Sequence, residues 1–334
     1  MRKSPLLLCL LAACAGQDAP ADPGAAAPPE VRAAWRPIVG EYSNGADTVS
    51  ILEEDGGLVL LYWGGDRTEL TAAAYGTFTT ESAAVATIRR GVDGRTESVS
   101  VGARGFDRLS LGADDGGTFR ITPIRAADEL RAEALAASPP EEEGDFRESD
   151  LVEIVTLDST IALDVRYATT NNFMGEVFYS EPRAFLQRPA AEALVRAHHW
   201  LGSRGYGLLV HDGYRPWYVT KMFWDATPEE LRIFVANPAN GSRHNRGCAV
   251  DLTLYDLDTG AAMTMTGGYD EMSPRSYPDY PGGTSRQRWH RELLREAMEA
   301  QGFTVYEAEW WHFDYQDWRS YRIGNERFGE LGME

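Results

Sequence analysis

Residues 242–254 read Ser-Arg-His-Asn-Arg-Gly-Cys-Ala-Val-Asp-Leu-Thr-Leu, which places a histidine, His244, seven residues before a carboxylate, Asp251. The second half of this stretch, 249–254, alternates well enough to form a strand. Gly247 lies between the two side chains and lets the backbone turn, so both side chains could converge on one point. We therefore expect His244 and Asp251 to bind the same ion.

A third ligand is available near the end of the chain, where residues 309–312 read Glu-Trp-Trp-His. Two histidines and one aspartate form a normal three-ligand set for zinc, which leaves the fourth position for water. The sequence thus predicts a catalytic site with one Zn²⁺ ion per catalytic domain, held by His244, Asp251 and His312.

Two further residues would complete a peptidase site. Glu309, three residues before His312, could act as the general base that takes a proton from the attacking water. Residues three apart on a regular strand face opposite ways, so this role requires a twist or a bulge. Arg215 follows a short buried strand, 207–210, and could stabilise the negative charge of the transition state. The alternative for Arg215 is an ion pair with a surface acid.

Other hydrolase classes find little support in the sequence. It contains neither a His-Glu-x-x-His motif nor a Gly-x-Ser-x-Gly motif, and Cys248 has no evident general-base partner. The net charge of −19, from 32 basic and 51 acidic residues, argues against binding to nucleic acid or to an anionic membrane surface.

The first 14 residues have the features of an export signal. Arg2 and Lys3 precede a short apolar run, 6–13, which is too short to cross a bilayer as a helix. The ending Leu-Ala-Ala-Cys resembles the bacterial lipoprotein cleavage box, so Cys14 is the expected lipidation site. An ordinary secretory signal is the alternative. We expect an exported lipoprotein of the periplasm, anchored at the outer membrane, that touches the membrane through its lipid alone.

The rest of the chain is long enough for two domains. Residues 15–34 are rich in Ala, Pro, Gly and Asp and predict a flexible tether. Residues 35–125 predict a small accessory domain of short strands, the last at 118–121, forming an antiparallel sheet, barrel or sandwich. A helix and an acidic linker follow at 126–150. Residues 151–334 predict an α+β catalytic domain with a central antiparallel sheet, in which 161–167 form a strand.

Four motifs in this second domain resemble those of the zinc D-alanyl-D-alanine dipeptidases, the VanX type. They are Tyr-Ala-Thr-Thr-Asn-Asn-Phe (167–173), Asp-Gly-Tyr-Arg-Pro (212–216), Ser-Arg-His-Asn-Arg-Gly-Cys-Ala-Val-Asp (242–251) and Glu-Trp-Trp-His (309–312). The resemblance implies the hedgehog/D-Ala-D-Ala peptidase-like fold of zinc D,D-peptidases. It covers a little over half of the chain and does not extend to the accessory domain.

The resemblance also assigns roles. It implies that His244, Asp251 and His312 bind zinc, that Glu309 is the base and that Arg215 acts on the transition state. It adds four substrate-binding residues: Asp270 for the free ammonium group, Ser242 near the terminal carboxylate, and Tyr167 and Tyr179 along the pocket. A pocket that reads both termini accepts only dipeptides.

The sequence departs from the family pattern at Asn171, at Cys248 and at Thr266-Gly267-Gly268-Tyr269 before Asp270. None of these removes a ligand or the base, but they leave the dipeptide preference open. The expected function is hydrolysis of D-Ala-D-Ala in the turnover of cell-wall peptides. The alternatives are a D,D-carboxypeptidase that acts on longer peptidoglycan peptides and a non-catalytic, wall-binding lipoprotein.

Overall fold

The computed structural model describes residues 26–74, 76–111 and 118–331. These residues form two compact units. The first comprises the described residues up to Leu109 together with Gly282–Arg286, and the second comprises the remainder. The predicted lipidation site, Cys14, and the rest of the predicted signal lie outside the described residues.

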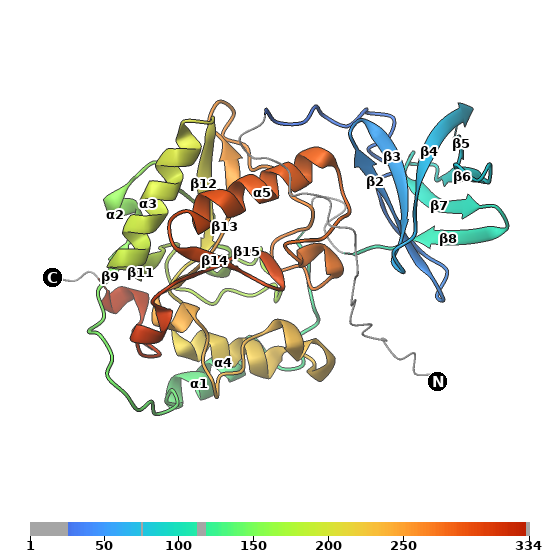
Figure 1. Cartoon of the computed structure of the whole chain (residues 1–334). Helices are drawn as coiled ribbons and strands as arrows, with labels where there is room; N and C mark the ends of the chain where they lie inside the picture. Colours follow the sequence, from blue (N-terminus) through green and yellow to red (C-terminus); the bar gives the residue numbers. More distant parts are fainter. Residues whose placement is uncertain (1–25, 75, 112–117, 332–334) are drawn as a thin grey trace. The chain divides into compact units, whose positions relative to one another are not determined.

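The first unit is a closed barrel in which each strand pairs antiparallel with the next and β8 pairs with β1 (Figure 1). A barrel was among the predicted forms of this domain. Its strands are β1 (Gly40–Ser43), β2 (Thr48–Glu54), β3 (Gly57–Tyr62), β4 (Arg67–Ala74), β5 (Thr77–Thr79), β6 (Val85–Arg90), β7 (Thr96–Val101) and β8 (Arg104–Arg108).

Sequence features explain the barrel locally. Asp55 and Gly56 join β2 to β3 with φ angles of 49° and 77°, the left-handed conformation that two-residue hairpin turns require. Alternate apolar side chains from all of the strands fill the interior. The predicted strand at 118–121 is wrong, because these residues have no regular secondary structure and Ile121 N–H donates to Phe173 in the second unit.

The second unit contains a five-stranded sheet with the order β10-β12-β13-β15-β14. Four strands are antiparallel, as predicted, but the edge strand β10 runs parallel to β12, so the sheet is mixed. The bounds are β10 (Ala162–Leu163), β12 (Tyr206–Asp212), β13 (Ala249–Asp256), β14 (Phe303–Tyr306) and β15 (Glu309–Tyr315); a separate two-stranded sheet joins β9 (Leu151–Glu153) to β11 (Phe185–Gln187).

The described residues also form helices, at least two of which contact this sheet. They are α1 (Ala127–Ala136), α2 (Ile154–Leu157), α3 (Arg188–Gly202), α4 (Trp217–Ala226) and α5 (Ser285–Glu299). His198 of α3 accepts a hydrogen bond from the backbone N–H of Leu208 in β12, and Trp289 of α5 packs against Tyr206. Among the described residues, no helix combines the length and the apolar character needed to cross a bilayer.

Candidate metal centre and active site

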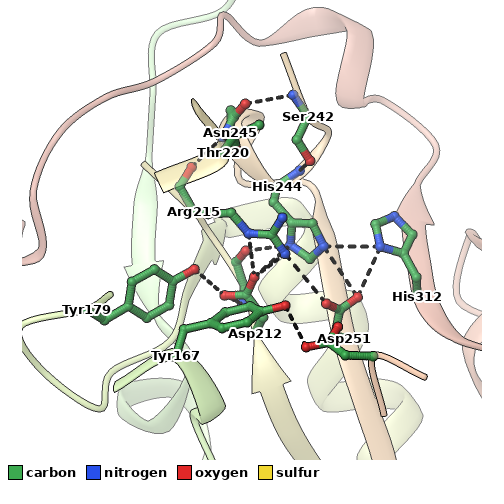
Figure 2. A network of polar contacts seen from close by, with 12 residues as sticks. Tyr167, Tyr179, Asp212, Arg215, Thr220, Ser242, His244, Asn245, Asp251 and His312 are labelled. Atoms are coloured by element: carbon green, nitrogen blue, oxygen red, sulfur yellow. Dashed lines mark hydrogen bonds and ion pairs between the residues drawn. The ribbon is translucent and has the colours of Figure 1, made fainter. Parts of the chain in front are cut away.

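Three side chains converge at the centre of the sheet (Figure 2). Asp251 of β13 and His312 of β15 are direct cross-strand partners, and His312 Nδ1 lies 3.0 Å from Asp251 Oδ1. His244 Nε2 lies 3.3 Å from the same oxygen and 3.1 Å from His312 Nδ1. Among the described residues, these are the groups gathered closely enough to hold a metal ion.

Gly247 brings His244 to this point. Its φ of 68° turns the chain sharply between the short 3₁₀ helix that carries His244 and the start of β13. A Cβ at this position would also come within 2.4 Å of Leu151 Cδ2. Glycine is therefore required both for the backbone conformation and for space, as the sequence suggested.

Hydrogen bonds at the far side of each ring orient both histidines. His244 Nδ1 donates to the carbonyl of Gly213 at 2.7 Å, which leaves Nε2 facing Asp251. His312 Nε2 contacts Asp314 Oδ1 at 3.0 Å, and Arg243 pairs with the other oxygen of Asp314 at 2.6 Å. Partners of this kind are typical of histidines that bind metals.

The electrostatics of the cluster also suit a cation. Burial opposes the protonation of His312, but Asp314 and Asp251 outweigh it and raise the pKa of this histidine to about 10. The same negative field favours a metal ion between the ring and Asp251. Two imidazole nitrogens and one carboxylate oxygen match the ligand set of a catalytic zinc site.

Glu309 stands beside this cluster at the first position of β15. Its Oε2 lies 3.7 Å from His312 Nδ1. The pairing of β14 with β15 slips between Val305 and Tyr306, so that Tyr306 faces Glu309. The bulge that the sequence required is thus present. Burial, with Asp251 adding to it and His312 opposing it, raises the pKa of Glu309 to about 7.

Arg215 projects into the site just after β12. The pairing of β12 with β13 has a bulge between Val210 and Asp212, which sets Asp212 opposite Asp251. Nε and Nη2 of Arg215 donate to Asp212 Oδ2 at 2.9 and 2.7 Å. The partner of Arg215 is therefore a fully buried acid rather than a surface acid.

The predicted substrate residues fall into two groups. Tyr167, Ser242 and Asp270 line the same pocket as the metal cluster, and the Tyr167 hydroxyl donates to Asp270 Oδ2 at 2.9 Å. Burial and the nearby Asp251 raise the pKa of Asp270 well above its usual range. Tyr179 instead lies behind Arg215, where its hydroxyl donates to Asp212 Oδ1 at 2.6 Å.

One local prediction near the pocket is wrong. Residues 161–167 were expected to form a continuous strand, but β10 is only two residues long, and Tyr167 lies in a 3₁₀ turn, Arg166–Ala168. Five aromatic rings lie within 6.4 Å of the Tyr167 ring and hold it in place. Tertiary packing therefore decides the conformation of this apolar run.

Three residues with clear contacts to the site were not singled out from the sequence: Asp212, Asp314 and Tyr269. The Tyr269 hydroxyl donates to Asp251 Oδ2 at 3.0 Å. Burial raises the pKa of Tyr269 well above its usual range, so it remains a hydrogen-bond donor. Asp212 lies within a quoted motif, and Asp314 follows the predicted ligand His312 by two residues; these positions were the available signals.

The cluster has the donors of a metal centre, and comparison with known proteins gives the family of the chain. Residues 147–328, just over half of the chain, match the family model described as D-ala-D-ala dipeptidase. The chain belongs to this family of zinc metallopeptidases and is an enzyme. The barrel strands lie outside the matched residues.

Relatives agree with the family match. The D-alanyl-D-alanine dipeptidase of Escherichia coli is 32% identical over 54% of this chain and 92% of its own length. That of Enterococcus faecium is 37% identical, covering 46% of this chain and 85% of the relative. A solved LD-carboxypeptidase structure is 17% identical over 62% of this chain and 82% of that chain, with a TM-score of 0.30, which is too low to establish a shared fold.

Proposed function

We propose that the protein is a zinc-dependent dipeptidase that hydrolyses D-alanyl-D-alanine to two D-alanines. One observation carries this proposal: the His244, Asp251 and His312 donors converge in the same pocket as Glu309 and Arg215. Two relatives are named D-alanyl-D-alanine dipeptidase, which supports D-alanyl-D-alanine as the substrate. The complete set of groups argues against a wall-binding protein without catalytic activity.

His244, Asp251 and His312 would hold the ion. When bound there, a zinc ion would lower the pKa of a water molecule to about 7 and would polarise a carbonyl oxygen. Glu309 then has the position of a general base: it accepts a proton as water adds to the peptide carbon. The same carboxylic acid returns that proton to the amine nitrogen when the C–N bond breaks, so the proton balance closes.

Arg215 serves the oxygen of the scissile carbonyl, which gains negative charge as water adds. Its guanidinium lies beside the metal ligand, with Nη2 3.8 Å from Asp251 Oδ2. Because Asp212 fixes the guanidinium before substrate arrives, little reorganisation is needed during the reaction.

Asp270 favours a dipeptidase over a carboxypeptidase. A partly buried carboxylate with a raised pKa gains from a neighbouring cation, and the free ammonium group of a dipeptide supplies one. Ser242, on the lining of the same pocket, is proposed to lie near the terminal carboxylate of the substrate. A longer wall peptide has no ammonium group at this distance from its end, so it would leave Asp270 unpaired.

We also propose the cellular setting that the N-terminal sequence indicates. Lipidation at Cys14 would anchor the enzyme at the outer membrane, facing the periplasm. There it would act on dipeptides or peptidoglycan fragments released during wall turnover.

The test is release of D-alanine by the purified protein. D-Ala-D-Ala, L-Ala-L-Ala and a wall pentapeptide ending in D-Ala-D-Ala are each supplied with and without a zinc chelator. We expect cleavage of the D,D-dipeptide alone, its loss with chelator and its return with added zinc. His244→Ala should abolish zinc binding and turnover. Release of D-alanine from the pentapeptide would shift the assignment to a carboxypeptidase. If the zinc-bound protein released no D-alanine from any of the three, it would not be a peptidase acting on these substrates.

A further inference from the structure

The two oxygens of Asp251 have different surroundings. Oδ1 faces the ligand nitrogens of His244 and His312, at 3.3 and 3.0 Å. Oδ2 accepts the hydroxyl proton of Tyr269 at 3.0 Å and lies 3.8 Å from Nη2 of Arg215. One oxygen thus belongs to the metal cluster, while Tyr269 and Arg215 flank the other.

Apolar contacts fix the position of the Tyr269 hydroxyl. The ring is 7% exposed and lies against three rings, with centroid distances of 4.6 Å to His211, 5.6 Å to Trp311 and 6.3 Å to Tyr167. The hydroxyl is therefore held where Asp251 needs a donor before the hydrogen bond forms. Such prior placement reduces the entropy lost in ordering the carboxylate.

We propose that Tyr269 is a positioning residue for the metal ligand Asp251. Its hydroxyl holds Oδ2, so that Oδ1 alone is presented to the ion and Oδ2 does not close onto Arg215. The proposal rests on the metal site proposed above. It gives a role to a tyrosine in the segment where this sequence departs from the family pattern.

Two effects should follow from loss of the hydroxyl. Asp251 would be free to rotate about its side-chain bonds, which weakens the binding of zinc. Its freed oxygen would also pair more closely with Arg215 and draw that guanidinium from the reacting carbonyl. Removal of a hydrogen-bond partner of a metal ligand typically costs at least about 10-fold in metal affinity.

The experiment measures zinc affinity of the full chain by competition with a chromophoric chelator. Tyr269→Phe removes the hydroxyl and keeps the ring. The matched control is Tyr255→Phe, four residues from Asp251 on the same strand, whose hydroxyl donates instead to the carbonyl of Thr160 at 2.8 Å. We expect affinity to fall about 10-fold or more for Tyr269→Phe and to remain unchanged for the control.

Thermal unfolding separates positioning from a general structural role. Metal-free Tyr269→Phe should unfold only slightly below the metal-free wild type, because a single hydrogen bond is lost, whereas added zinc should raise the midpoint less in the variant. Equal zinc affinity in the two proteins overturns the proposal, as does a metal-free variant that is already much less stable. If His244→Ala binds zinc like the wild type, the metal site itself is wrong, and the proposal fails with it.

Discussion

Asp212 binds Arg215 through a single carboxylate oxygen, which accepts hydrogen bonds from both Nε and Nη2 of the guanidinium. Both side chains are buried, and the other oxygen of Asp212 accepts the Tyr179 hydroxyl and the backbone N–H of Gly213. The carboxylate is thus held from several directions. Arg215 reaches the metal cluster with its orientation already set.

The paired hydrogen bonds from Arg215 to Asp212 predict the effect of Arg215→Lys. A lysine keeps the charge but cannot make two directed bonds to Asp212 while facing the reacting oxygen. We expect kcat to fall by about 10²–10³ while KM changes much less. The control is Arg188→Lys, a partly exposed ion pair with Asp150, which should retain wild-type kinetics. A similar loss in both variants would contradict a specific role for Arg215.

Glu309→Gln and Glu309→Ala test the general base. Both should bind zinc, because Glu309 is not among the proposed ligands, yet both should lose turnover by at least about 10²-fold. Zinc content and kcat measured on the same samples separate the two properties. The exposed Glu307, two residues earlier, provides the control as Glu307→Gln. Turnover near that of the wild type in the Glu309 variants would show that another group takes the proton.

Asp270→Asn tests recognition of the substrate ammonium group. Loss of one member of a buried charge pair costs about 2–5 kcal/mol, so KM for D-Ala-D-Ala should rise by about 30-fold or more. N-acetyl-D-Ala-D-Ala, which lacks the ammonium charge, should be a poor substrate of the wild type and should lose little further in the variant. A parallel loss on both substrates would mean that Asp270 has a different role.

The cluster that could hold a metal ion could be predicted from the sequence, whereas the groups that orient its side chains could not. His244, Asp251 and His312 have side chains that bind metals and lie in short motifs, so residue type alone made them candidates. The roles of Asp212 and Tyr269 depend on where each chain segment comes to lie. The bulge between Val210 and Asp212 shifts the register of the pairing with β13, and no local pattern in the sequence marks that shift.

In the fold, too, the elements specified by local sequence could be predicted, and those that depend on distant partners could not. Periodic patterns in the sequence predict helices over 189–204 and 286–301, which agree with α3 and α5 to within about two residues, because a long amphipathic helix is specified locally. The apolar run at 161–167 was misread, since its short strand pairs with a distant segment, β12, and its tyrosine is held by an aromatic cluster. Short strands gain too little from local preference to be placed without their partners.

Arg275→Met should destabilise the loop that carries Asp270. Nε and Nη2 of Arg275 donate to the buried Glu271 at 2.7 and 2.9 Å, and Glu271 also accepts the backbone N–H of Gly268. Removing one partner of such a pair leaves a buried charge and costs about 3–5 kcal/mol of unfolding free energy.

Urea unfolding would measure this cost. In a double-mutant cycle, replacing Glu271 with the neutral Gln as well should recover much of the lost stability, because no unpaired charge then remains. If the two single losses simply add, Arg275 and Glu271 do not act as a pair.

Asp158 predicts an acid-sensitive component of stability. Its carboxylate accepts hydrogen bonds from the Thr160 hydroxyl and backbone, and it also pairs with His199, so its pKa falls from 3.8 to about 2. A lowered pKa adds stability above the unfolded value of 3.8, and this contribution is lost as the pH falls towards 2. Asp158→Asn should therefore be less stable than the wild type at pH 6, with the gap closing near pH 2. Urea unfolding at both pH values would measure it, and a gap independent of pH would contradict the prediction.

Closure of the barrel by β1 and β8 has a consequence for how this protein could be rebuilt. Tyr42 pairs with Arg108, so the chain enters and leaves the barrel strands at neighbouring points. Domains whose two ends meet in this way can be inserted into other proteins or exchanged for another module. The ends of the strand-forming stretch 40–108 could thus be joined and new termini opened at a hairpin such as the turn between β6 and β7.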